Sequence, residues 1–143
     1  MRYTQEQWDA LICDMASLGQ EYLVMCNVAS NGFSVYDSQV LPKIPMACPD
    51  PLEAVMTAAD RYGMKVFLNN DYFNDALYYK TAEMFEPENV RGRYRILEEV
   101  AARYSGHPSF YGWYWAWESH LSPCFPEHFL RYVNETTQEA RRL

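Results

Sequence analysis

The sequence lacks several features that mark large classes of proteins. No apolar run approaches the ~20 residues that a membrane-spanning helix needs, and the N-terminal MRYTQEQWDA is too polar for the apolar part of a signal peptide. Lys and Arg number only 12 against 19 Asp and Glu, which gives a net charge of -7, and no basic stripe is present. Because a phosphate backbone is bound by such a stripe, we expect neither a nucleic-acid partner nor a membrane span.

Motifs for cofactors, metals and disulfides are also missing. The four cysteines show no C-x-x-C spacing, the three histidines form no ligand set, and neither G-x-G-x-x-G nor a P-loop occurs. We therefore expect no cofactor and no metal. Cys13 and Cys26 fall on apolar helix and strand positions, which predicts that they are small core residues rather than disulfide partners.

The composition is that of one globular domain. The chain has 143 residues, of which 49% are hydrophobic and 22% charged. Aromatic residues make up 16%, and many of them lie in the expected loops as well as in the core. This excess indicates a surface on which a ligand stacks.

Helices and strands alternate along the chain. Helical spacing of apolar residues occurs in four segments, Thr4 to Gly19, Asp50 to Gly63, Pro87 to about Gly106, and about Pro126 onward. Between them lie three short apolar runs, Tyr22 to Asn27, Met64 to Asn69, and Phe110 to Trp117. Each run follows a helix-ending glycine at a near-constant spacing, which is typical of a repeated α/β unit with parallel strands and right-handed crossovers.

The loops are long at only one end of the predicted sheet. Strand-to-helix connections run from Val28 to Pro49 and from Asp71 to about Glu86, whereas helix-to-strand connections take a few residues. In (β/α) barrels the strand-to-helix loops form the working face. Three strands cannot close an eight-stranded barrel, so a small open sheet is one possibility. We favour an α/β fold in which residues 1–143 are a single, incomplete part of a (β/α)8 TIM barrel, in the order α-β-α-β-α-β-α.

Glu118 is the strongest candidate for chemistry. It ends the run SFYGWYWAWE, whose other residues are all uncharged. Partial burial at the end of an apolar strand raises the pKa of a carboxyl, which suits a general acid. We predict a general acid/base; the alternatives are a structural or ligand-binding carboxylate. Strand alternation places Trp113 and Trp115 on the helix-facing side, with Trp117 at the rim where a ligand would meet it.

Further polar and aromatic residues gather at the same end. The predicted substrate-binding set comprises Asn27, Tyr36, Asn69, Asn70, Asp71, Tyr72 and Trp117. Amides and carboxylates hydrogen-bond hydroxyl groups, and aromatic faces suit the apolar faces of sugar rings. The alternative is that the Asn and Asp residues only form strand-end turns and that the aromatics only pin the long loops to the barrel rim.

Three blocks of sequence resemble a known family. FSVYDS (Phe33 to Ser38), AADRYGMKVFLNN (Ala58 to Asn70) and HPSFYGWYWAWE (His107 to Glu118) resemble an uncharacterised bacterial family of TIM-barrel, glycoside-hydrolase-like proteins. The resemblance implies that the chain supplies the second to fourth β/α units and that Glu118, at the end of the fourth strand, is the acid/base. It also implies a periplasmic or secreted protein, a location that the chain itself does not indicate.

The chain departs from two patterns among such barrels. Trp117 stands where the large retaining clan usually has an Asn before the acid/base. Chitinase-like barrels have Asp at the positions of Ala116, Tyr114 and Tyr111, so chitinase chemistry is disfavoured. Neither retention nor inversion follows from these residues.

Two functions remain open at this point. The first is a glycoside hydrolase that cleaves O-glycosyl bonds with Glu118 and a second carboxylate from elsewhere in the barrel, in which case these 143 residues alone are inactive. The second is a noncatalytic carbohydrate-binding barrel module. Both predict a carbohydrate ligand, and both predict that the open strand edges pair with the remaining part of the barrel or with another copy of the chain.

Overall fold

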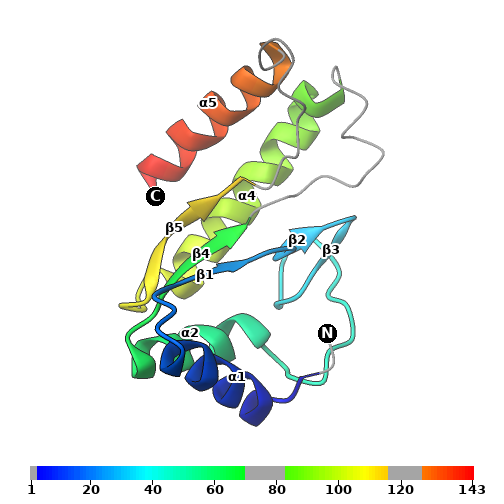
Figure 1. Ribbon diagram of the computed structural model, residues 1–143. Helices are drawn as coiled ribbons and strands as arrows, with labels where there is room; N and C mark the ends of the chain where they lie inside the picture. The colour runs from blue at the N-terminus through cyan, green and yellow to red at the C-terminus, as the bar shows by residue number, and fades with distance from the viewer. Residues whose placement is uncertain (1–2, 70–82, 116–126) are drawn as a thin grey trace.

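The computed structural model describes residues 3–69, 83–115 and 127–143, which form a mixed α/β fold (Figure 1). In these ranges the helices are α1 (Gln5–Ser17), α2 (Pro51–Tyr62), α4 (Pro87–Tyr104) and α5 (Glu127–Arg142), with a 3-10 turn η1 (Glu83–Phe85) before α4. The strands β1 (Tyr22–Met25), β4 (Lys65–Asn69) and β5 (Phe110–Tyr114) form one sheet, and β2 (Ala29–Ser30) and β3 (Phe33–Ser34) form a hairpin.

Local sequence signals set the helix ends as predicted. The Thr4 side chain accepts from the N–H of Gln7, and the Gln7 side chain accepts from the N–H of Thr4, which completes the capping box of α1. Asp50 caps α2 in the same way by accepting from the N–H of Glu53. At the other end of α2, Gly63 has φ 73°, a left-handed conformation that glycine adopts without strain.

The three main strands are parallel and lie in chain order, β1-β4-β5. Tyr22 pairs with Lys65 at the start of β1, and Asn69 pairs with Tyr114 at the end of β5. One irregularity interrupts the pairing of β4 with β5 beside Val66 and Phe67. Helices that follow each strand around such a sheet form an arc of an α/β barrel, which confirms the predicted fold class.

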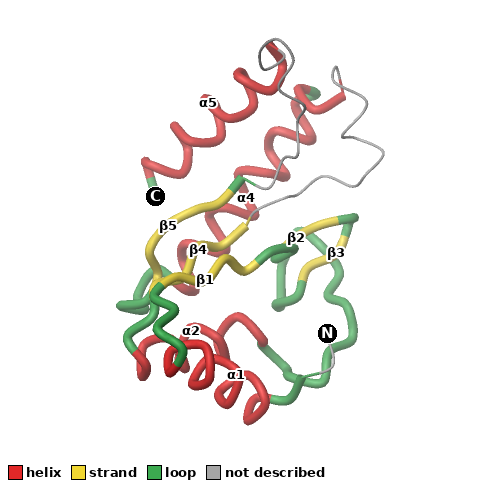
Figure 2. Tube along the Cα trace, in the orientation of Figure 1, coloured by secondary structure: helices red, strands yellow, loops and turns green. Residues whose placement is uncertain are grey.

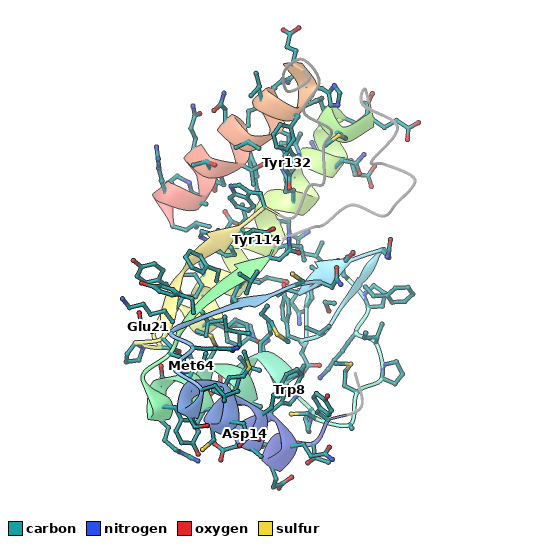
Figure 3. The ribbon with its side chains drawn as sticks, viewed as in Figure 1. Trp8, Asp14, Glu21, Met64, Tyr114 and Tyr132 are labelled. Atoms are coloured by element: carbon teal, nitrogen blue, oxygen red, sulfur yellow. The ribbon has the colours of Figure 1, made fainter. Side chains whose placement is uncertain are left out.

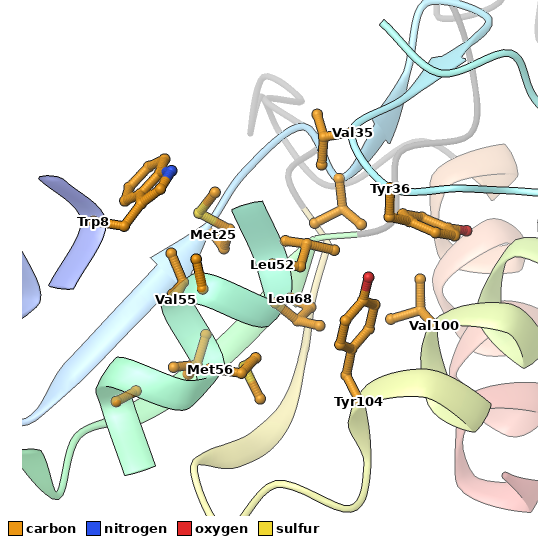
Figure 4. Close-up of a cluster of buried hydrophobic side chains, with 14 of the residues drawn as sticks. Trp8, Met25, Val35, Tyr36, Leu52, Val55, Met56, Leu68, Val100 and Tyr104 are labelled. Carbon is orange, nitrogen blue, oxygen red and sulfur yellow. The ribbon is translucent and has the colours of Figure 1, made fainter. Parts of the chain in front are cut away.

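The core lies between the sheet and its helices. Figure 2 shows α1 and α2 side by side along one face of the sheet, and Figure 4 shows buried side chains that pack where these helices, the sheet and α4 meet. Val66 and Leu68 of β4 point into this core with 0% exposure, as do Leu52 and Val55 of α2. Burying each such side chain contributes roughly 1.5–3 kcal/mol, so this layer stabilises the arrangement of the strands.

The opposite face of the sheet is uncovered within the described ranges. Tyr22 is 49% exposed and Tyr111 is 53% exposed, and both rings contact Phe67 between them. Cys26 follows on this same face and is exposed, so its predicted place in the core is wrong. Cys13 and Cys48 are free, as Cys26 is.

Two further predictions meet the structure here. Trp113 packs against the core, and Trp115 donates from Nε1 to Oγ1 of Thr137 on α5 at 3.1 Å, so both tryptophans lie on the helix side as predicted. The long connection from Val28 to Pro49 was expected as a loop, yet it contains the β2–β3 hairpin. Among the described residues, no helix combines the length and the apolar character that crossing a membrane requires.

Candidate functional site

The carboxyl ends of the three parallel strands lie at the same end of the sheet, where a buried asparagine joins them by hydrogen bonds. Asn69, at the end of β4, is 1% exposed. Its Oδ1 accepts from the backbone N–H of Asn27 at 3.3 Å, just beyond β1. Its Nδ2 donates to the carbonyl oxygen of Tyr114 at 3.3 Å, at the end of β5. One side chain therefore fixes the ends of all three strands relative to one another.

Asn27 turns the chain out of the sheet. Its φ is 58°, in the left-handed region where asparagine is the best tolerated residue after glycine. Residues held in this region concentrate at functional sites, since the surrounding structure must maintain them against their own preference. Here the hydrogen bond to Asn69 provides part of that restraint. Asn27 and Asn69 are two of the predicted binding residues, and the structure brings them together.

A two-residue turn forms the hairpin that follows. Asn31 and Gly32 both have positive φ, 52° and 76°, and they connect β2 directly to β3. This is the conformation of a type I′ turn, which favours Asn-Gly because both central residues must be left-handed. The Asn-Gly pair is the sequence signal for this hairpin, so the prediction of a single loop over residues 28–49 is wrong at this point.

A pocket of about 250 Å³ lies between the end of β1 and the hairpin. It is lined by Asn27, Ser30, Asn31, Phe33, Ser34, Val35 and Ile44, none of which is charged. Phe33 is 47% exposed, whereas Val35 is 3% exposed. The pocket thus combines an accessible aromatic ring, an apolar base and an amide from the strand end. Of its lining residues, only Asn27 belonged to the predicted set.

Glu99 of α4 anchors the loop that carries this pocket. Its Oε2 accepts from the hydroxyl of Tyr36 at 3.0 Å and from Oγ of Ser38 at 2.5 Å, and its Oε1 accepts from the N–H of Gln39 at 2.7 Å. Tyr36 is completely buried, and its ring meets that of Tyr104 edge to face (Figure 4). Burial raises the pKa of the Tyr36 phenol, and the neighbouring Glu99 carboxylate raises it further. Protein contacts therefore occupy both the ring and the hydroxyl of this predicted binding residue.

A second network extends the same anchor toward α2. Asp50, which caps α2, also accepts from the hydroxyl of Tyr104 at 2.9 Å and from Nη2 of Arg103 at 3.4 Å. Arg103 donates in addition to the carbonyl oxygen of Asp37 at 2.8 Å. Burial and the charge of Asp50 both raise the pKa of the Tyr104 phenol. The segment between β3 and α2 is thus fastened to α4 at both of its ends.

The opposite end of the sheet, where the strands begin, carries a different polar cluster. Just before β5, His107 contacts Asp60 through Nδ1 at 2.7 Å and Glu53 through Nε2 at 3.3 Å. Asp60 also accepts from the N–H of Ser109 at 2.8 Å. Burial alone would lower the pKa of His107, but its hydrogen bonds to Asp60 and Glu53 outweigh burial and raise it. These contacts hold α2 to the start of β5, which agrees with a stabilising role for this end.

The remaining predicted residues lie outside the described ranges. They are Glu118, Trp117, Asn70, Asp71 and Tyr72. Asn70 is next to Asn69 in the sequence, and Glu118 follows Tyr114 by four positions, so both continue from strands whose ends Asn69 ties. Among the residues that the structure does describe, no group of three or more His, Cys, Asp and Glu side chains is arranged to hold a metal ion.

Comparison with known proteins places the chain in a family and gives it a structural neighbour. The model of a family described as "Domain of unknown function (DUF4434)" matches residues 1–143. No curated protein matches. A crystal structure described as a "putative alpha-L-fucosidase" from Bacteroides thetaiotaomicron VPI-5482 superposes with a TM-score of 0.59 at 21% sequence identity. The match covers 78% of this chain and 35% of that one, so this chain spans about a third of the neighbour's length.

Proposed function

Because the chain belongs to the DUF4434 family and has a glycoside-hydrolase-like fold, we propose that it is part of a carbohydrate-active barrel in which Glu118 is the general acid/base. The 143 residues then form one incomplete domain, corresponding to the second to fourth β/α units. The observation that carries this proposal is the tie between the three strand ends by Asn69. In α/β barrels, catalytic groups project from this end of the sheet.

The proposed chemistry needs one proton donor beside the scissile bond. Glu118 donates a proton to the glycosidic oxygen as the bond breaks, and in a retaining reaction the same carboxylate then takes a proton from the attacking water. Asn69 acts indirectly, because its bond to the carbonyl oxygen of Tyr114 fixes the end of the strand that leads to Glu118. The sugar is held by hydrogen bonds from the amides and the carboxylate and by stacking on the aromatic rings of the predicted set, which are Asn27, Asn70 and Asp71, and Tyr72 and Trp117, respectively. Tyr36 is buried and does not contact the sugar; its hydrogen bond to Glu99 holds the loop in place.

A second carboxylate completes the site. It lies about 5–5.5 Å from the first in retaining enzymes and about 6.5–9.5 Å in inverting ones. Asp37 is an unsuitable partner, because its carboxylate is paired with Lys43 at 3.0 Å. We therefore assign the second carboxylate to another part of the full-length barrel, in keeping with the 35% of the neighbour's length that this chain spans.

The test is hydrolysis of aryl glycosides by the full-length protein, with 4-nitrophenyl α-L-fucopyranoside first in the panel. Glu118→Gln should lower kcat/KM by about 10²–10⁴-fold, the usual contribution of a general acid. The loss should be smaller on 2,4-dinitrophenyl glycosides, whose leaving group departs without a proton. The matched control is Glu21→Gln, because Glu21 and Tyr114 lie at opposite ends of the sheet (Figure 3). Equal losses on both classes of leaving group would show that Glu118 is not the acid.

The second candidate is a noncatalytic carbohydrate-binding module. It is favoured by the described strand ends, where Asn27 and Asn69 provide amides and no carboxylate. This alternative predicts sugar binding without hydrolysis of any glycoside. Glu118→Gln would then weaken binding by about 3 kcal/mol at most, the upper end of the range for one hydrogen bond to a charged group.

A further inference from the structure

The β2–β3 hairpin pocket has features of a ligand site that the strand-end residues do not by themselves explain. It opens beside Asn27, whose backbone is bonded to Asn69, and so it adjoins the end of the sheet where the three strands end. We propose that this pocket is a subsite for one neutral sugar ring of the substrate. Phe33 stacks on the apolar face of the ring, and the side-chain amide of Asn27 hydrogen-bonds its hydroxyls. This inference rests on the proposed function.

The chemistry of the lining matches a sugar ring. Phe33, which is 47% exposed, presents a hydrocarbon ring, and Ile44 extends the apolar surface beside it. Asn27 adds an amide that both donates and accepts, which suits hydroxyl groups. A pyranose has the same two-sided character, with C–H groups on its faces and hydroxyls around its edge. Ser34 takes no part, because it is 1% exposed and its hydroxyl donates to the carbonyl oxygen of Tyr36 at 2.6 Å.

The volume of the pocket and the lack of charge in its lining restrict the class of ligand further. The pocket volume of about 250 Å³ is below the ~300–1,000 Å³ of sites for drug-sized ligands, which suits a single ring. No lining residue is charged, and the chain as a whole carries -7. An anionic sugar such as a uronate would lose water without gaining a counter-charge, so the pocket favours neutral sugars.

The pocket is formed before any ligand binds. Backbone hydrogen bonds join the N–H of Val35 to the carbonyl of Val28 at 3.1 Å, and the N–H of Ile44 to the carbonyl of Ser34 at 3.0 Å. The Glu99 anchor then fixes the segment just after β3. A rigid pocket loses little conformational entropy on binding, which favours recognition of a small ligand.

The experiment measures sugar binding by the full-length protein and by its Glu118→Gln variant. Saturation-transfer NMR and calorimetry use L-fucose, D-galactose, D-glucose and D-glucuronate as probes. Phe33→Ala should weaken the best neutral sugar by about five- to tenfold, and Phe33→Tyr should retain its binding. Asn27→Gly should weaken it by about three- to tenfold, since glycine keeps the positive φ and the backbone bond to Asn69 while removing the amide. D-glucuronate should bind more weakly than the neutral sugars.

The matched control is Tyr22→Ala, because Tyr22 is 49% exposed, close to the exposure of Phe33, but starts β1 at the opposite end. It should leave binding unchanged. Unchanged affinity in both Phe33→Ala and Asn27→Gly, or no binding of any neutral sugar, would overturn the subsite. The proposed function is judged separately, by the hydrolysis that Glu118→Gln removes. Retained binding with no hydrolysis would refute the catalytic assignment and leave the subsite standing.

Discussion

Replacing Glu99 by alanine should loosen the loop that carries the hairpin pocket. Glu99 accepts three hydrogen bonds, from Tyr36, Ser38 and Gln39. The hydroxyl of Tyr36 is the decisive donor, because Tyr36 is completely buried and its hydroxyl would lose this acceptor away from bulk water. A buried donor left without its partner costs about 1–3 kcal/mol, whereas Ser38 and Gln39 lie nearer the surface and can turn to water. Losing the other two hydrogen bonds adds about 0.5 kcal/mol each, so we expect a total loss of about 2–4 kcal/mol in the free energy of unfolding.

The assay is urea unfolding at pH 7, with hydrogen exchange as a local readout. Exchange should accelerate in residues 33–44 and remain slow in β4. Glu98→Ala is the matched control, since Glu98 precedes Glu99 on α4 but, among the described residues, forms only an exposed pair with Arg142 at 3.1 Å. That change should cost no more than about 0.5 kcal/mol.

A double-mutant cycle isolates the buried contact. Tyr36→Phe removes the donor itself, so combining it with Glu99→Ala should cost about 1–2 kcal/mol less than the sum of the single changes. Two results would refute this reasoning: a loss in Glu99→Ala no larger than that in Glu98→Ala, or strict additivity in the cycle.

Two further predictions concern the two ends of the sheet. Asn69→Ala should lower the free energy of unfolding by about 1–3 kcal/mol, because the carbonyl of Tyr114 and the N–H of Asn27 lose their partner. Urea unfolding measures this loss, and an unchanged midpoint would contradict the role of Asn69 in joining the strand ends. At the other end, the raised pKa of His107 predicts stability that is fully present below its unfolded pKa of about 6.5 and is lost as the pH rises through the higher folded value. Unfolding between pH 4 and 9 should therefore show a decline above about pH 6.5 that His107→Gln removes, and the same slope in that variant would contradict the assignment.

The elements of this fold could be predicted because their signals are local. Thr4 and Gln7 lie within one turn of α1, and Gly63 ends α2 by its own conformational freedom. The Asn-Gly turn of the hairpin is an equally local signal, but β2 and β3 have only two residues each, too few to show an apolar period. Cys26 was misplaced for another reason: an apolar strand residue faces the core only if something covers its side of the sheet.

The candidate site was predictable in kind but not in detail. Polar residues at strand ends pointed to Asn27 and Asn69, yet nothing in their positions showed that one accepts from the backbone of the other. Tyr36 was chosen for its aromatic ring in a long loop, and its burial against Glu99 depends on a residue 63 positions away. Phe33 was passed over as part of the same loop, although it lines the pocket.

The sequence by itself determined the α/β order, the helix ends and the end of the sheet that carries the polar residues. These follow from apolar period, caps and glycines, all of which act over a few neighbouring residues. Only the tertiary structure decided that Asn69 joins three strand ends, that Tyr36 faces inward and that the hairpin forms a pocket. The first two outcomes depend on contacts between segments more than 40 residues apart, and a side chain's partner at that distance is fixed by packing rather than by its own type. The pocket depends on backbone contacts over shorter separations, which join Val28 to Val35 and Ser34 to Ile44.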